Sequence, residues 1–223
     1  MSARQGRRRR SSTILSIKPE LDALSVPQGM TAVHVGVPLQ ATALKEIDEL
    51  GVSKIFVMAN NSSRPLVAAF VAVLEEKGLL AAPLNSDVGM GGGEAGLLKA
   101  CDEAAAAKAD CVVTVGGGAI QDAGKLVRLW LSAVDGKATV SGIQGAAKDP
   151  APLPPQIACP NSFAMAELTS VAGITTSDNT KSGAADPSMM PTVSGNHLWR
   201  WLLGEDGEPI IIMLKDEDGN PAP

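Results

Sequence analysis

One segment near the middle of the chain constrains the fold more than any other. It reads CVVTVGGGAIQDAGK over residues 111–125. Residues 111–115 are apolar or β-branched and predict a strand, and residues 119–132 have the apolar spacing of a helix. A strand that passes through three glycines directly into a helix is typical of a parallel α/β sheet. Glycines at that turn let a ligand approach the backbone, and the start of the helix offers free N–H groups that suit a pyrophosphate.

Two interpretations of these glycines stay open on the residues alone. One is a phosphate cradle, and the other is a tight strand-to-helix turn with no ligand. The segment is neither a GxGxxG fingerprint nor a P-loop, because no Lys-Ser or Lys-Thr pair follows the glycines at the required spacing. A second cluster of glycines, within residues 89–93, follows no convincing strand and favours a loop that leads into a helix.

Strand and helix patterns alternate on both sides of this segment, which predicts a Rossmann-like parallel sheet with helices on both faces over residues 31–192. The expected strands span residues 31–37, 53–59, 79–83, 111–115 and 156–160, and the expected helices span residues 39–50, 66–77, 94–109 and 119–132. Residues 135–155 hold four Pro and three Gly and predict a loop. The alternation stops after Pro191, so we expect residues 193–223 to form an atypical tail outside the sheet.

The charges divide the chain into a basic arm and an acidic body. The first 18 residues hold six of the 19 basic residues and no acid, which leaves 13 basic against 24 acidic residues, a net charge of −11. Such an acidic body is a poor binder of nucleic acid, because contacts with phosphates need Lys and Arg on the binding face, and we therefore expect no nucleic-acid partner. Residues 1–30 are therefore either a disordered arm of a cytoplasmic protein or, alternatively, a mitochondrial transit peptide.

Composition excludes several other classes of protein. No apolar run reaches the ~18 residues that a membrane span needs, so we expect no membrane partner. Three scattered cysteines form neither a disulfide framework nor a CxxC metal site and fit a reducing compartment. The two histidines, His34 and His197, have no acid at helical ligand spacing, so we expect no metal in this chain. Asp122 and Lys125 share one helix face and, taken alone, are an ordinary surface pair.

Two motifs together give the chain a specific resemblance. GGGAIQDAGK resembles the GGGS-x-x-D-x-x-K signature of the iron-containing alcohol dehydrogenase family. Residues 157–191, IACPNSFAMAELTSVAGITTSDNTKSGAADPSMMP, are similar to that family's second nucleotide motif, in particular to its maleylacetate reductase type. The resemblance covers roughly residues 30–192. It implies a dehydroquinate synthase-like, dinucleotide-binding amino-terminal domain, and it implies that the family's carboxyl-terminal helical domain is missing here.

The resemblance assigns residues of the first motif to the dinucleotide. Gly116, Gly117 and Gly118, together with Ala119, would cradle the pyrophosphate of NAD or NADP. Asp122 would anchor the helix near the site. The cofactor expected from the family is thus a nicotinamide dinucleotide, and the Asp and three His that bind iron or zinc in the alcohol dehydrogenases belong to the missing half.

The resemblance also assigns residues outside that motif. Asn161 and Ser162 stand where the family usually has two Thr that hydrogen-bond the nucleotide, and Lys181 matches a Lys near the nicotinamide ribose. Asn60 stands where many members have an Asp that binds the adenosine ribose hydroxyls. An Asn lacks the charge that repels a 2′-phosphate, so both NAD and NADP stay open.

The resemblance implies an NAD(P)-dependent oxidoreductase that transfers hydride to a small carbonyl or enoate substrate, in a truncated form that we expect to be inactive alone. The alternative is an inactive nucleotide-binding fragment, or a partner of a full-length homologue. A homodimer is also open, and a lyase is a distant third possibility, since the fold is shared with dehydroquinate synthase. Ala164 and Met165 depart from small Gly or Ser positions of the second motif and are expected to narrow the pocket.

Overall fold

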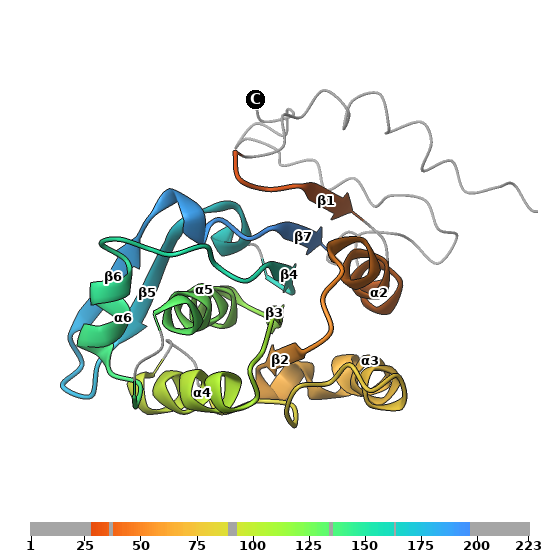
Figure 1. Ribbon diagram of the computed structural model, residues 1–223, viewed down its shortest axis with the longest axis horizontal. Helices are drawn as coiled ribbons and strands as arrows, with labels where there is room; N and C mark the ends of the chain where they lie inside the picture. Colours follow the sequence, from red (N-terminus) through yellow and green to blue (C-terminus); the bar gives the residue numbers. More distant parts are fainter. Residues whose placement is uncertain (1–27, 36–37, 89–92, 134–135, 163, 197–223) are drawn as a thin grey trace, which may run out of the picture. The chain divides into compact units, whose positions relative to one another are not determined.

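A computed structural model describes residues 28–35, 38–88, 93–133, 136–162 and 164–196. Over these residues the chain forms a five-stranded parallel sheet with helices on both faces, together with a separate antiparallel hairpin (Figure 1). The predicted fold class is therefore confirmed. Most of the predicted basic arm, the glycines at 89–92 and residues 197–223 lie outside the described residues.

The strands of the sheet are ordered β1-β7-β4-β3-β2, and all neighbours are parallel. The sheet strands are β1 (Ala32–Val35), β2 (Ile55–Ala59), β3 (Cys111–Gly116), β4 (Gln156–Pro160) and β7 (Val193–Asn196), and the hairpin consists of β5 (Val171–Thr175) and β6 (Lys181–Ala185). The helices are α2 (Leu39–Leu50), α3 (Arg64–Glu76), α4 (Glu94–Ala106), α5 (Gly118–Ser132) and α6 (Val140–Ala146), and the 3-10 turns are η2 (Asn61–Ser63), η3 (Ala166–Leu168) and η4 (Pro187–Met189).

Strand β2 shows how the sheet builds two cores. Phe56 and Met58 belong to one buried apolar cluster, which includes residues of α4, α5 and α6. Ile55, Val57 and Ala59 belong to a second cluster, with residues of α2 and α3. Successive side chains of a strand point to opposite faces, so a strand that is apolar throughout requires helices on both sides. Figure 1 shows α2 and α3 on one side of the sheet and α4 and α5 on the other.

The end of α2 and the start of α3 lie where the sequence predicts them, at a glycine and at a proline. Helix α2 ends at Gly51, whose left-handed φ of 67° places its N–H back on the last turn. Helix α3 has Pro65 in its first turn, where a missing N–H costs nothing. Among the described residues, no helix is long and apolar enough to span a bilayer.

Three expectations about the elements are corrected. Residues 79–83 form no strand: Leu80 pairs with Ile55 of β2 at an isolated bridge, and a second isolated bridge, between Asn85 and Met58, lies beyond this segment. The loop predicted over residues 135–155 contains α6, because the Thr139 hydroxyl accepts a hydrogen bond from Gly142 N at 3.0 Å and caps the helix.

The third correction concerns the predicted end of the domain at residue 192. Residues Val193–Asn196 form β7, which lies inside the sheet between β1 and β4. Its four residues VSGN include one large apolar side chain, Val193, so periodicity alone gives little signal there. The backbone pairs that β7 makes with its two neighbours define it instead.

Candidate functional site

The candidate site lies where three neighbouring strands end. The sheet register pairs Ala59 with Val115 and Gly116 with Pro160, so the residues that follow β2, β3 and β4 meet at one edge of the sheet. These residues are Asn60, Gly117 and Asn161. Ligands of parallel α/β sheets bind outside the carboxyl ends of the strands. The structure thus brings together predicted site residues that are far apart in the sequence.

The glycines at the end of β3 let neighbouring groups approach the backbone closely. A Cβ on Gly116 would lie 2.9 Å from Ile120 Cγ1, so close packing by α5 requires glycine there. A Cβ on Gly117 would lie 3.4 Å from the Ser162 hydroxyl oxygen, and one on Gly118 would lie 3.0 Å from the Ala164 methyl group. Gly117 therefore faces the Ser162 hydroxyl directly and lies at the start of α5, which puts a hydroxyl group and a helix N-terminus at one glycine.

The backbone conformation at Gly117 does not require a glycine. Its φ of −75° and ψ of −175° are open to any residue. Gly117 is also the residue that precedes α5, and it has no side chain with which to cap the helix. The Ile120 N–H donates to the Gly117 carbonyl at 3.0 Å, whereas the N–H groups of Gly118 and Ala119 precede the first acceptor within the helix and are available to an anion. A side chain at Gly117 would affect a ligand rather than the turn.

A buried serine links the residues that follow β2 and β4. The Ser63 hydroxyl accepts a hydrogen bond from Asn161 Nδ2 at 2.7 Å and donates one to Asn60 Oδ1. Ser63 is only 2% exposed. The backbone N–H of Asn161 also donates to the Gly116 carbonyl at 3.0 Å. Both asparagines are thereby held against the glycine turn. The role of Ser63 was not predictable from local sequence, because its partner Asn161 is 98 residues away.

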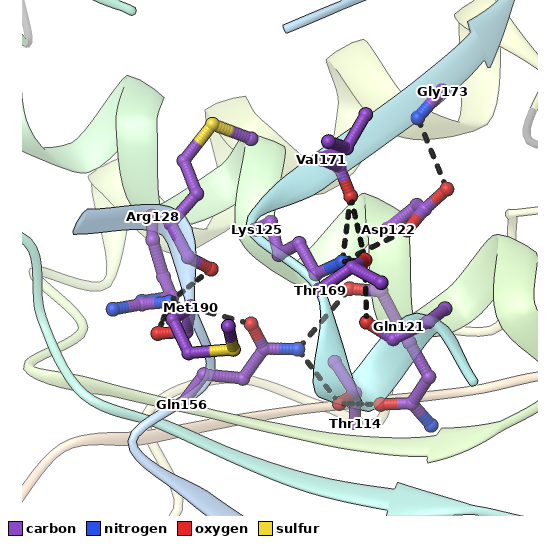
Figure 2. A network of polar contacts seen from close by, with 12 residues as sticks. Thr114, Gln121, Asp122, Lys125, Arg128, Gln156, Thr169, Val171, Gly173 and Met190 are labelled. Carbon is purple, nitrogen blue, oxygen red and sulfur yellow. Dashed lines mark hydrogen bonds and ion pairs between the residues drawn. The ribbon is translucent and has the colours of Figure 1, made fainter. Parts of the chain in front are cut away.

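A buried amide and hydroxyl network supports the glycine turn from inside the protein (Figure 2). Gln121 Nε2 donates to the Gly116 carbonyl at 3.0 Å, and Gln121 Oε1 accepts from the Thr114 hydroxyl at 2.6 Å. Gln156 Nε2 donates to Thr114 Oγ1 at 3.0 Å and to the Gln121 carbonyl at 3.1 Å. All three side chains are buried. Sequence analysis missed this network, although two glutamines among apolar neighbours are a recognisable signal.

Asp122 and Lys125 are not the surface pair that helix spacing suggests. Lys125 is fully buried, and its Nζ lies 3.2 Å from Asp122 Oδ1, 3.1 Å from the Thr169 hydroxyl and 2.6 Å from the Val171 carbonyl (Figure 2). Burial lowers the pKa of Lys125, and Asp122 opposes that shift. Asp122 Oδ2 accepts from Gly173 N at 3.0 Å. The pair therefore attaches the β5–β6 hairpin to α5.

Lys181 lies on that hairpin rather than on the glycine turn. It is exposed, it pairs with Thr175 across the two strands, and its Nζ donates to Thr175 Oγ1 at 2.5 Å. Two positions further along the hairpin, Gly173 pairs with Gly183, and the Gly173 N–H donates a hydrogen bond to Asp122. Asp122 is thus the link between the helix of the glycine turn and the hairpin that bears Lys181.

Glu167, near Lys125, has one carboxylate oxygen without a hydrogen bond to any described residue. Glu167 is 2% exposed, and its Oε2 has no hydrogen-bond partner among the described residues. Burial raises the pKa of Glu167, and Lys125 acts in the opposite direction. Met165, which we expected to narrow the pocket, has a left-handed φ of 57° and is 53% exposed. Ala164, by contrast, lies directly against Gly118.

Metal-ligating side chains do not gather in the part of the chain that the structure describes. No three His, Cys, Asp or Glu side chains come together there. The described histidine, His34, has its Nε2 2.6 Å from Glu46 Oε1. A single histidine beside a single carboxylate does not make up the ligand set of an iron or zinc centre.

Comparisons with known proteins point to one family. A sequence model of the family described as iron-containing alcohol dehydrogenase matches residues 31–194. The solved maleylacetate reductase of Agrobacterium tumefaciens is 25% identical, with a TM-score of 0.57, and the match covers 78% of this chain and 41% of that one. A comparison with curated proteins found no match.

Two more distant solved structures share the fold. The NADH-dependent butanol dehydrogenase A of Thermotoga maritima is 21% identical, with a TM-score of 0.66, over 83% of this chain and 46% of that one. The sulfoacetaldehyde reductase of Bifidobacterium kashiwanohense, solved in complex with NAD+, is 16% identical, with a TM-score of 0.61, over 77% of this chain and 45% of that one. The present chain thus spans less than half the length of these solved relatives.

Proposed function

The chain belongs to the iron-containing alcohol dehydrogenase family, and from this premise we propose that it binds a nicotinamide dinucleotide at the carboxyl edge of its sheet. The family consists of oxidoreductases, among them alcohol dehydrogenases and maleylacetate reductases. The observation that carries the proposal is the backbone of Gly117, which has no side chain and meets both the Ser162 hydroxyl and the uncapped start of α5. A phosphate placed there would be held by the hydroxyl and by N–H groups of the helix.

The proposed binding mode follows from how the residues lie. The pyrophosphate would contact the backbone from Gly116 to Ala119, with the Ser162 hydroxyl as a further hydrogen-bonding group. Asn161, held by Ser63 and by the Gly116 carbonyl, would line the same space. The buried network under Gly116 keeps the turn in place before a ligand arrives, which lowers the entropic cost of binding.

The two ends of the dinucleotide would extend in opposite directions from this cradle. Asn60, at the end of β2, would contact the adenosine ribose. Asp122 and the hairpin residue Lys181 would lie towards the nicotinamide ribose, since Asp122 joins α5 to the hairpin. The nicotinamide itself supplies the hydride chemistry when bound. The residues of this chain bind and orient it.

For the whole protein we propose hydride transfer to a small carbonyl or enoate substrate. A second candidate function is nucleotide binding without hydride transfer, either alone or as a partner of a longer homologue. The chain's span of less than half of its solved relatives favours testing that candidate directly. Both candidates require the same dinucleotide site and differ only in catalysis.

Calorimetric titration of the full chain with NADH and with NADPH tests the shared site. We expect at least one of them to bind with a stoichiometry of one per chain, and binding of neither would refute the proposal. Adding small aldehydes and maleylacetate-like enoates to the loaded chain then separates the candidates. Loss of reduced-nicotinamide absorbance supports the enzyme, and unchanged absorbance with retained binding supports the binding module.

A further inference from the structure

We infer that Ser63 is a positioning residue that makes this site prefer NADPH over NADH, by fixing which side of the Asn60 amide faces the ligand. This inference rests on the proposed dinucleotide function and adds to it the chemical class of the cofactor. Three observations support it: the orientation of the Asn60 amide, the lack of acidic residues from residue 60 to residue 74, and Arg64 at the start of α3, which forms no ion pair within the described residues.

The first observation is the hydrogen-bond relay. The Ser63 hydroxyl has one proton to donate, and that proton goes to Asn60 Oδ1, while the same oxygen accepts from Asn161 Nδ2 at 2.7 Å. The Asn60 oxygen also faces the glycine turn, because a Cβ on Gly116 would lie 3.4 Å from it. The Asn60 oxygen is therefore turned towards Ser63 and has one of its two lone pairs engaged, whereas the NH₂ group forms no hydrogen bond within the described residues and keeps both donors for a ligand.

The chemistry of the two cofactors makes this orientation decisive. An adenosine ribose with a free 2′-hydroxyl is best held by an acceptor, which is why dinucleotide sites for NAD place a carboxylate there. A 2′-phosphate offers only acceptors and negative charge, so it is best held by N–H donors and cations. An Asn60 that turns its oxygen to Ser63 and its two donors to the ligand matches the phosphate and offers the free hydroxyl a poorer acceptor than a carboxylate would.

The second and third observations concern charge. No acidic residue occurs from residue 60 to residue 74, and the first turn of α3 contains none. Arg64 begins α3, is exposed, and forms no ion pair with any residue in the described ranges. Its guanidinium is a planar, permanently charged donor that suits phosphate oxygens. The segment after β2 therefore carries a positive charge and no carboxylate from residue 60 to residue 74, with Arg64 four residues after Asn60 in the sequence.

Parallel titrations of the full chain with NADPH and NADH test the inference. We expect NADPH to bind at least about tenfold more tightly, since hydrogen bonds to charged groups carry the difference. Ser63→Ala frees both asparagine amides to rotate, so the ratio of the two dissociation constants should fall towards one. The matched control is Ser62→Ala, which removes an exposed neighbouring hydroxyl and should leave the ratio unchanged. A purely structural role for Ser63 would weaken both cofactors equally.

Two further variants test the same inference without touching the buried serine. Asn60→Asp keeps one carboxylate oxygen for Ser63 and presents the other to the ribose, so it should reverse the preference in favour of NADH. Arg64→Gln should weaken NADPH by about tenfold and leave NADH unchanged. Because Arg64 is exposed, this variant should fold as the wild type does.

The outcomes separate the inference from the proposed function. If the wild-type chain binds NADH as tightly as NADPH, or more tightly, the inference is wrong and the dinucleotide site stands. If the ratio survives in Ser63→Ala, the selectivity does not depend on the relay and the role assigned to Ser63 is wrong. If neither cofactor binds to the wild type, the proposed function itself fails.

Discussion

Replacing Gly124 with alanine should destabilise the protein by disturbing the layer on which the glycine turn rests. Gly124 lies on α5 where the helix contacts the sheet. A Cβ there would lie 2.3 Å from Thr114 Cγ2 and 2.7 Å from Gln156 Nε2. Real atoms do not approach so closely, so either α5 moves outward or the Gln156 side chain turns away. Both movements break the hydrogen bonds that Gln156 makes with Thr114 and with the Gln121 carbonyl.

The size of the effect follows from three contributions. Inserting a methyl group into a close-packed contact costs about 1–3 kcal/mol. Losing two buried hydrogen bonds adds roughly 1 kcal/mol each, and the better helix propensity of alanine returns up to ~1 kcal/mol. The net loss in the free energy of unfolding is therefore about 2–4 kcal/mol. For a chain of this length that lowers Tm by about 4–16 °C.

Urea and thermal unfolding of the full chain, followed by circular dichroism, measure this loss. Gly145→Ala is the matched control, because it is also a helical glycine but is exposed, and its Cβ would meet nothing within 4 Å. We expect Gly145→Ala to leave stability unchanged or raise it by up to ~1 kcal/mol. A Gly124→Ala protein as stable as the wild type would show that α5 does not pack against β3 and β4 as described.

Two further predictions concern buried ionisable groups. Lys125→Met leaves Asp122 and the Val171 carbonyl without their buried partner and should lower the free energy of unfolding by about 3 kcal/mol. The matching Lys99→Met change, at a side chain that is 58% exposed and pairs with Asp87, should cost far less, and equal losses in urea unfolding would contradict the role assigned to the Asp122–Lys125 pair. Burial raises the pKa of all three cysteine thiols above 9.0, that of Cys159 to about 12, so they stay protonated in the folded state while the unfolded thiols ionise. The contribution of the protonated thiols to the free energy of unfolding is therefore complete below about pH 9 and is lost as the pH rises above it, by up to ~1.4 kcal/mol per thiol and pH unit. In urea unfolding between pH 8 and about 10.5, Cys159→Ala should reduce this fall of the free energy of unfolding with pH by about a third.

The parts of the fold that were predictable from the sequence are those governed by local patterns. Residues 39–50 have helical apolar spacing and a glycine stop, and the structure has α2 at those bounds. Residues 156–160 are a short apolar run, and they form β4. The glycines after β3 indicated the site because their chemistry is local: a strand end, an open turn and a helix start lie in consecutive residues.

The parts that were not predictable depend on contacts between distant residues. Lys125 looks like a surface lysine in the sequence, and it is buried because Val171, 46 residues away, supplies a carbonyl to its Nζ. Strand β7 is too short and too polar to show a strand period, and it exists because β1 and β4 both pair with it. The pairing of Ser63 with Asn161 likewise needs the parallel register of the sheet, which no local pattern contains.

Dinucleotide binding by wild-type chain and by Gly117→Val, measured side by side in the same fluorescence titration, tests the central claim most directly. The φ of −75° at Gly117 accepts a valine, and its Cβ would lie no closer than 3.4 Å to Ser162 Oγ, so the variant should unfold at the wild-type temperature. The branched side chain would nevertheless fill the space assigned to the pyrophosphate. We predict that the wild type binds NADPH and that Gly117→Val loses this binding by a factor of roughly 100 or more, which corresponds to about 3 kcal/mol. Equal binding by the two proteins would mean that the glycines are only a turn and that the dinucleotide lies elsewhere.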